Sequence, residues 1–291
     1  MFSFDWVIYI IHFIMKANTK FKNIFNRNGY YHFENIFSKD DLDNVEKNVY
    51  QFANLFSKKI DSKLFKTEIV NFKGFNKFCI NLEKYNKDYF FNFTALASNI
   101  YQIHNLINNN NLLRYASKLL DENKNHLLIQ KPTLLINIPK NKRILYHWHN
   151  AKNSYPKRNK CLNLWFPIIK DKTLKNGSMD IAEKSHFKDY PFLEFKGFSK
   201  DKKNALNQYL VPNSLVKEFK IRKIEAKVGS CLAMHHNLLH SSTTNFTNFC
   251  SFVVIFKIWS ISDDLTLSNN IQQKYFMNDN GAGSDVRKAK N

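Results

Sequence analysis

The sequence lacks the features that mark secreted, disulfide-bonded and repeat proteins. Its four cysteines form no CxxC pair, and most of them lie within apolar runs: Cys79, Cys161, Cys231 and Cys250. These side chains are therefore expected to be buried free thiols in a reducing compartment, which predicts a cytoplasmic protein. No internal repeat is visible along the chain.

A long hydrophobic run is also missing. The apolar stretch at residues 2–15 is too short to cross a bilayer and is interrupted by Asp5 and His12. No basic residue precedes it and no small-residue cleavage site follows it, which argues against a signal peptide. Lysines come next, so weak peripheral membrane association through residues 2–22 is one interpretation. The favoured one is an apolar helix over residues 1–26 that packs against the rest of the fold.

Negative charge is scarce: 24 Asp and Glu stand against 44 Lys and Arg, which gives a formal net charge of +20. The basic residues are scattered through every segment. No basic stripe, RNP-like aromatic pattern or zinc-finger spacing accompanies them, so we predict no nucleic-acid partner. Weak attraction to anionic membrane surfaces or acidic glycans is what the charge leaves open.

Helical patterns fill the first part of the chain and strand-like runs the second. Ser38 precedes two acidic residues and apolar residues at helical spacing, which predicts a capped helix. Further helices are predicted over about 91–107 and 111–120. A strand is predicted near residues 28–35, and later strands over 127–129, 134–138, 144–149, 161–169, 178–181, 229–235 and 252–259.

These patterns predict one mainly β domain with N-terminal helices over residues 27–265, followed by a polar tail over 266–291. The Lys-rich segment 185–225 has no clear period and is predicted to be a long insertion over one mouth of the β domain.

Two histidines carry the strongest chemical signal, because His149 and His240 each end an apolar, strand-like run. Two imidazoles and a carboxylate two residues after the first would make the facial triad of a non-haem Fe(II) oxygenase. Ala151 stands at that third position and cannot bind a metal. Since alternate residues of a strand share a face, His147 is an alternative third metal ligand, or it packs at the barrel mouth.

Five segments in order resemble phytanoyl-CoA dioxygenase-like proteins. They are Gly29–Ser38, Trp148–His149, Leu162–Ile169, Asn176–His186, and Gly229–Met234 continued through His240, Asn245 and Thr247. The resemblance covers roughly residues 28–260 and implies a double-stranded β-helix, the jelly-roll or cupin-like fold. It also implies Fe(II) held by His149 and His240, and 2-oxoglutarate bound between the two sheets.

The chain departs from that family pattern at several positions. The family has Asp or Glu where Ala151 stands, and Gly where Lys184 stands. Beyond the distal histidine it has an Arg that grips the far carboxylate of 2-oxoglutarate, whereas residues 248–251 contain no base. A dianion in a half-buried site needs a fixed cation. Lys257 is the predicted replacement because it shares a strand face with Ser251, although a solvated lysine is the other interpretation.

Asn163 and Trp165 share a face of their predicted strand. Asn163 could hydrogen-bond the co-substrate, with Trp165 beside it, or the pair could be an amide and an aromatic of the core. Asn245 is predicted to lie on the side of the pocket.

Three functions fit these residues. The first is a Fe(II)/2-oxoglutarate-dependent hydroxylase acting on a small molecule or glycan precursor. The second is a halogenase-like variant in which chloride takes the coordination position that Ala151 leaves open. The third is a catalytically inactive jelly roll that binds a ligand or partner.

Overall fold

The computed structural model describes residues 20–60, 63–141, 145–151, 160–191, 193–196 and 207–262. The predicted N-terminal helix lies mostly outside them, and so does the polar tail. A helix does cover residues 20–28, and its Phe21 and Phe25 are buried in the core, so this part packs against the fold as favoured. Within the described part of the chain, no helix is long and apolar enough to cross a membrane.

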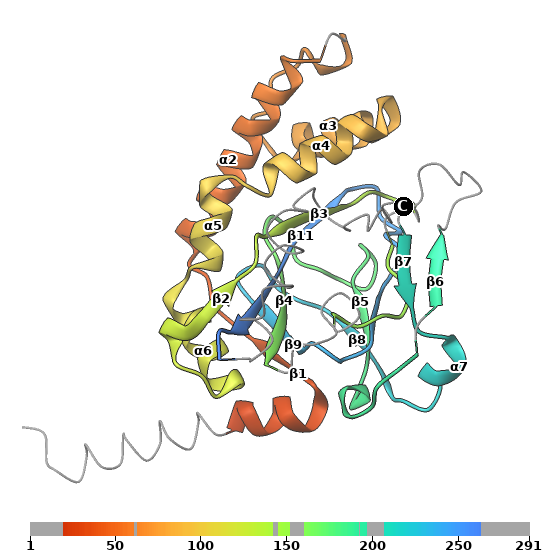
Figure 1. Cartoon of the computed structure of the whole chain (residues 1–291). Coiled ribbons are helices and arrows are strands. Elements are labelled where there is room, and N and C mark those ends of the chain that lie inside the picture. The colour runs from red at the N-terminus through yellow and green to blue at the C-terminus, as the bar shows by residue number, and fades with distance from the viewer. Residues whose placement is uncertain are drawn as a thin grey trace, which may run out of the picture.

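Two antiparallel sheets form the centre of the molecule (Figure 1). The larger sheet has the strand order β1 (Tyr30–Phe33), β9 (Cys231–His235), β4 (Cys161–Pro167), β11 (Ser251–Ser260) and β2 (Leu127–Ile129), and β3 (Thr133–Asn137) also pairs with β11. The smaller sheet has the order β10 (His240–Ser242), β5 (Met179–Ala182) and β8 (Ile221–Ile224). A separate hairpin joins β6 (Leu193–Lys196) to β7 (Asn207–Leu210).

The two sheets enclose a shared apolar cluster. The larger sheet contributes Trp165, Leu232, Met234 and Val253, and the smaller sheet contributes Met179, Ile181 and Ile224. Facing sheets that share a core in this way form the double-stranded β-helix that the sequence predicted.

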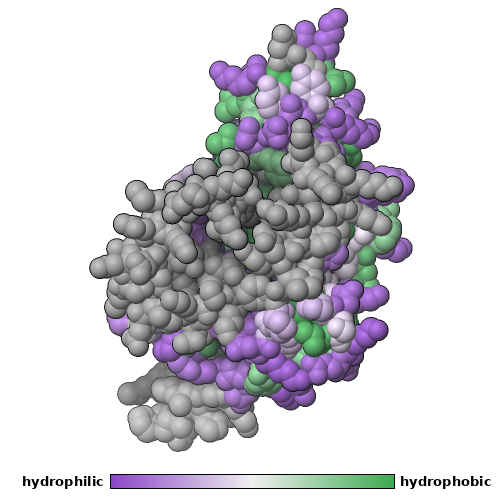
Figure 2. All heavy atoms as spheres, turned by 45° about the vertical axis from the view of Figure 1, so that its right-hand side comes forward, coloured by the Kyte–Doolittle hydropathy of each residue, from purple (hydrophilic) through white to green (hydrophobic). Residues whose placement is uncertain are grey.

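Helices cover the outer face of the larger sheet (Figure 1). They are α2 (Lys39–Ser57), α3 (Phe72–Tyr85), α4 (Lys87–Ala97), α5 (Tyr101–Ile107) and α6 (Asn110–Leu120), with a short α7 (Asn213–Val216) elsewhere. The ends of α2, α3 and α4 project beyond the sheets, and polar and apolar side chains mix on that end of the molecule (Figure 2).

Strand β11 shows why both faces of the larger sheet are apolar. Phe252, Val254 and Phe256 belong to the cluster shared with the helices, whereas Val253 and Ile255 belong to the cluster between the sheets. Each fully buried side chain of this size stabilises the fold by about 1.5–3 kcal/mol. Because strand residues alternate, Ser251 and Lys257 lie on the face turned toward the interior of the barrel.

Most predicted elements are confirmed, but the helical layer differs in two places. The predicted helix over 91–107 is wrong as one element, because it ends at Ala97 and resumes at Tyr101. At the break, the Ser98 hydroxyl donates to the Thr94 carbonyl and accepts the backbone N–H of Leu134 in β3. Helix α3 was not predicted, although its buried residues Phe75, Phe78, Cys79 and Leu82 have helical spacing.

The strand predictions fail in two segments. Residues 145–148 form no regular strand, and only His149 makes a β-bridge. The segment 185–225 is not simply an insertion, because it contributes β8 to the smaller sheet. The exposed basic residues of β8 hide its period, since only Ile224 of this strand is buried.

We expect Ser38→Ala to lower the free energy of unfolding by about 1 kcal/mol, the usual cost of losing an N-cap. Ser38 has extended backbone, and its hydroxyl accepts the N–H of Asp41 at the start of α2. Urea denaturation of the variant measures this change. Asn44→Ala, in the same helix but outside its first turn, is the control and is expected to leave stability nearly unchanged.

Candidate functional site

The two predicted histidine ligands lie next to each other at the edge of the smaller sheet. The N–H of His149 donates to the carbonyl of His240 over 3.1 Å, and the N–H of His240 donates back over 2.9 Å. The centroids of the two rings are 4.3 Å apart. Residues separated widely in sequence are therefore brought together by one antiparallel β-bridge, as a shared metal requires.

The hydrogen bonds of both rings fix the tautomer that suits a metal. Nδ1 of His149 lies 2.6 Å from the carbonyl oxygen of His147, and Nδ1 of His240 lies 2.9 Å from that of Leu238. A carbonyl oxygen can only accept, so each Nδ1 carries the proton. Each Nε2 therefore keeps its lone pair, which is the arrangement that a second hydrogen-bonding partner gives to metal-ligating histidines.

Both imidazoles are neutral at pH 7. Burial, helped by the positive charge of Lys257, lowers the pKa of His149 to about 4. Burial, the neighbouring His149 and the charge of Lys257 hold the pKa of His240 well below its usual value of 6.5. Protons therefore do not compete with a metal for these nitrogens near neutral pH. Because the charge of Lys257 lowers the pKa of both histidines, its ammonium lies close to both rings.

Among the residues that the structure describes, no third protein ligand joins this pair. Ala151 is buried, with 6% of its surface exposed. Among the described residues, no group of three His, Cys, Asp or Glu side chains is arranged to hold a metal ion. The chain bends at Trp148, and a charge on His147 would act on the His149 ring, but His147 forms no three-residue ligand group with His149 and His240 among the described residues. Ligation by His147 stays a prediction without support from this geometry.

Asn163 lies in the barrel interior with a carbonyl oxygen that needs a donor. Asn163 is 5% exposed, and its Oδ1 has no hydrogen-bond partner among the described residues. It lies opposite Lys257 of β11 and Met234 of β9. A buried amide oxygen without a partner is costly, so it fits a hydroxyl, amine or water of a bound molecule. Trp165 packs beside it in the apolar cluster between the sheets.

A cation that the sequence did not single out lies at Ser251. Nζ of Lys172 donates to Oγ of Ser251 over 2.6 Å, and this hydroxyl donates to the carbonyl of Asn176 over 2.8 Å. Lys172 is only 3% exposed. Burial lowers the pKa of its ammonium from the usual 10.5 to about 7. Nothing in the sequence separates this lysine from the many others, because its burial depends on a backbone pairing with Ala226.

Asn245 has a structural role rather than the pocket-side position predicted for it. Its side-chain amide donates to the carbonyls of Asn137 and Phe249, and its oxygen accepts from Thr247. These bonds hold the turn between β10 and β11. Gly177 packs against the same turn with φ +78°, where a Cβ would lie 2.9 Å from the backbone nitrogen of Asn245, so glycine is required.

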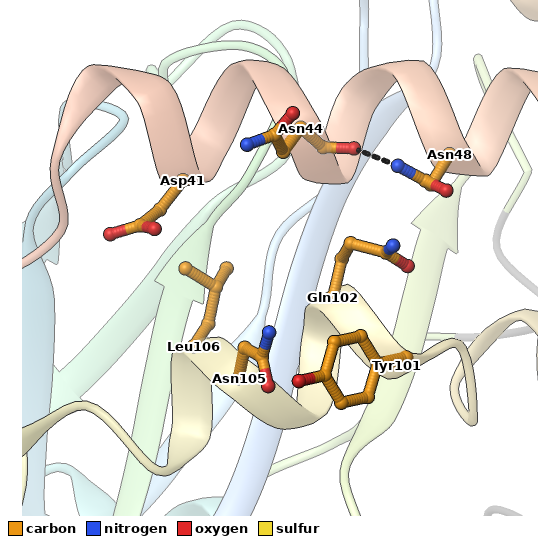
Figure 3. Close-up of a pocket in the computed structure, with 7 residues that line it drawn as sticks. All are labelled: Asp41, Asn44, Asn48, Tyr101, Gln102, Asn105 and Leu106. Carbon is orange, nitrogen blue, oxygen red and sulfur yellow. Dashed lines mark hydrogen bonds between the residues drawn. The ribbon is translucent and has the colours of Figure 1, made fainter.

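A surface groove of about 270 Å³ lies between α2 and α5 (Figure 3). It is lined by Asp41, Asn44, Asn48, Tyr101, Gln102, Asn105 and Leu106. Neutral amides and a single carboxylate make it a polar hollow without acid–base or metal chemistry.

The fold has clear relatives among solved structures. EctD from S. alaskensis with bound Fe has a TM-score of 0.55 at 16% identity, covering 83% of this chain and 76% of that one. The non-heme alpha ketoglutarate dependent epimerase SnoN from nogalamycin biosynthesis has a TM-score of 0.53 at 12% identity, covering 84% and 83%. AviO1 from Streptomyces viridochromogenes Tue57 has a TM-score of 0.52 at 14% identity, covering 84% and 96%. At these identities the likeness shows the fold.

The sequence itself shows the family. Residues 25–250 match the profile of the phytanoyl-CoA dioxygenase (PhyH) family, although no curated protein matches the chain. Lys184, where the resemblance implies a glycine, keeps the left-handed backbone that glycine favours, with φ +65°. The chain therefore belongs to the phytanoyl-CoA dioxygenase family of Fe(II)- and 2-oxoglutarate-dependent oxygenases.

Proposed function

We propose that this protein is a Fe(II)- and 2-oxoglutarate-dependent oxygenase that hydroxylates a small molecule or glycan precursor. The observation that carries the proposal is the fixed tautomer of His149 and His240, with two neutral Nε2 atoms on adjacent rings. Core packing alone does not require this arrangement, whereas a shared metal does.

The residues present fit an iron site that depends on its co-substrate. His149 and His240 would hold the metal, and Ala151 adds no ligand. Iron with bound 2-oxoglutarate would supply the oxygen activation that the side chains cannot. The buried Oδ1 of Asn163 would accept a hydrogen bond from a hydroxyl or amine of a bound molecule.

A halogenase-like reaction is the second candidate, and one observation favours it. The positive charge of Lys257 acts on both histidines, and Ala151 leaves the carboxylate position open. A chloride at that position would meet a favourable charge where the family has a protein carboxylate.

Succinate formation tests the proposal. The protein is incubated with Fe(II), 2-oxoglutarate and oxygen, with and without chloride, and succinate is followed over time. Slow release above the His240→Ala background is expected even without the true substrate. His104→Ala, in helix α5, is the matched control and should keep the wild-type rate.

Each outcome decides between the candidates. Chloride-dependent turnover would favour the halogenase-like variant. Wild-type succinate equal to the His240→Ala background would leave a jelly-roll binding module, and the oxygenase proposal would be abandoned.

A further inference from the structure

Lys172 is a buried cation without an anionic partner among the described residues. No carboxylate of the described residues pairs with it, and burial alone accounts for the lowered pKa of its ammonium. The side-chain hydrogen bond of its Nζ goes to Ser251. An ammonium taken out of water without a counter-ion is expensive, so a fold that keeps it there has a use for the charge.

The charged groups nearest in the chain face other partners. The carboxylate of Asp171 accepts the backbone N–H of Val228. The carboxylate of Glu225 accepts the backbone N–H of Leu174. Lys170 lies over the ring of Phe72, on the helical side of the sheet, at 4.2 Å from its centroid. Within the described part of the chain, the ammonium of Lys172 is thus held by Ser251 and no carboxylate neutralises it.

The position of Lys172 connects it to the expected binding site of 2-oxoglutarate. Ser251 is fully buried at the start of β11. It also lies in the stretch where the family resemblance implies the arginine that grips 2-oxoglutarate. Lys172 reaches the same point from the segment after β4, where its backbone exchanges two hydrogen bonds with Ala226. A different element therefore brings a cation to the place of the missing side chain.

We propose that Lys172, positioned by Ser251, binds the distal carboxylate of 2-oxoglutarate, and that capture of this dianion is coupled to proton uptake at Lys172. The inference rests on the proposed function for the identity of the ligand. It replaces the expectation for Lys257, which lies six residues further along β11 and pairs with Asn163. The charge of Lys257 acts on His149 and His240 instead.

The coupling follows from the charge state of the free protein. With a pKa of about 7, Lys172 is largely neutral at pH 8 and charged at pH 6. A bound carboxylate favours the ammonium, so binding at pH 8 takes up about one proton. Affinity for 2-oxoglutarate should therefore be nearly constant below pH 7 and fall by up to about tenfold per pH unit above it.

Calorimetry of the Zn(II)-loaded protein with 2-oxoglutarate tests this without turnover. Titrations at pH 8 in two buffers with different ionisation enthalpies give the number of protons taken up, and titrations at pH 6 should give almost none. Lys172→Met should weaken binding about 10- to 100-fold, as loss of a charge-assisted bond implies, and should abolish proton uptake.

Two further variants make the test specific. Lys172→Arg should keep binding but take up no proton, because a guanidinium is always charged. Lys170→Met, on the outer side of the sheet, should behave as wild type. Unchanged affinity in Lys172→Met, or wild-type binding without proton uptake at pH 8, would overturn the proposal.

Failure of this proposal can be told apart from failure of the proposed function. If the wild-type protein forms succinate but Lys172→Met binds 2-oxoglutarate as tightly as the wild type, only the role of Lys172 is overturned. Lys172-dependent binding without any succinate would overturn only the oxygenase reaction. No binding of 2-oxoglutarate to the wild-type protein would overturn the role of Lys172 as well.

Discussion

Ala151→Asp is expected to tighten Zn(II) binding at the histidine pair by at least about 10- to 100-fold. The new carboxylate would stand at the third position of the facial triad. A charged interaction of roughly 1.5–3 kcal/mol corresponds to that factor. The positive charge of Lys257, which already acts on both histidines, would further favour an anion there. Competition titration with a coloured chelator measures the affinity.

Controls separate ligation from other effects of the substitution. Asn has nearly the same shape as Asp without its charge, so Ala151→Asn should tighten Zn(II) binding much less. Ala151→Asp combined with His240→Ala should lose the gain, because one histidine and a carboxylate hold Zn(II) poorly. Without metal, the buried carboxylate should lower the melting temperature of Ala151→Asp, and Zn(II) should restore it. Equal affinities for wild type and Ala151→Asp would mean that residue 151 does not face the metal position.

Lys172→Met should stabilise the protein by about 2–4 kcal/mol at pH 6, since it replaces an unpaired buried ammonium by an apolar side chain of similar length. The sign of the pH dependence follows from the lowered pKa, about 7 in the folded protein against the usual 10.5. Between pH 7 and pH 10.5, Lys172 is protonated in the unfolded chain and largely neutral in the folded protein. The wild-type free energy of unfolding should therefore rise with pH over that window, by at most about 1.4 kcal/mol per pH unit.

The difference between variant and wild type isolates this one group from other titrations. Urea denaturation at pH 6, 7, 8 and 9 should show the advantage of Lys172→Met shrinking as pH rises above 7. Lys170→Met should show no such trend. A constant difference at all four pH values, or a less stable Lys172→Met at pH 6, would mean that Lys172 is not a buried charge in the folded protein.

The sequence predicts those parts of the fold that leave a local pattern in the chain. The apolar runs of β4 and β11, and the capped start of α2, depend on neighbours in the chain and were predicted. The strand β8 was not, because three of its four residues are exposed and only Ile224 is buried. The break between α4 and α5 depends on Ser98 and its bond to Leu134, a contact across the fold that no local pattern reports.

Some residues of the candidate site could likewise be predicted from the sequence, and others could not. His149 and His240 were found because each ends an apolar run, and their neighbourhood is confirmed by the β-bridge. Lys172 was missed because its burial and its contact with Ser251 depend on a pairing with residue 226. Lys257 was placed on the interior face correctly by alternation. Its effect on the histidines, however, required knowing which end of β11 lies beside them.

Binding of Fe(II) and 2-oxoglutarate together tests whether His149 and His240 form a complete iron site. A 2-oxo acid that chelates Fe(II) through its keto oxygen and carboxylate gives a visible charge-transfer absorption, so an anaerobic titration reports the complete site. We expect a saturable band in the wild-type protein that needs both components, disappears in His240→Ala and His149→Ala, and requires more 2-oxoglutarate in Lys172→Met. A wild-type protein that gives no band at saturating Fe(II) and 2-oxoglutarate would contradict this expectation.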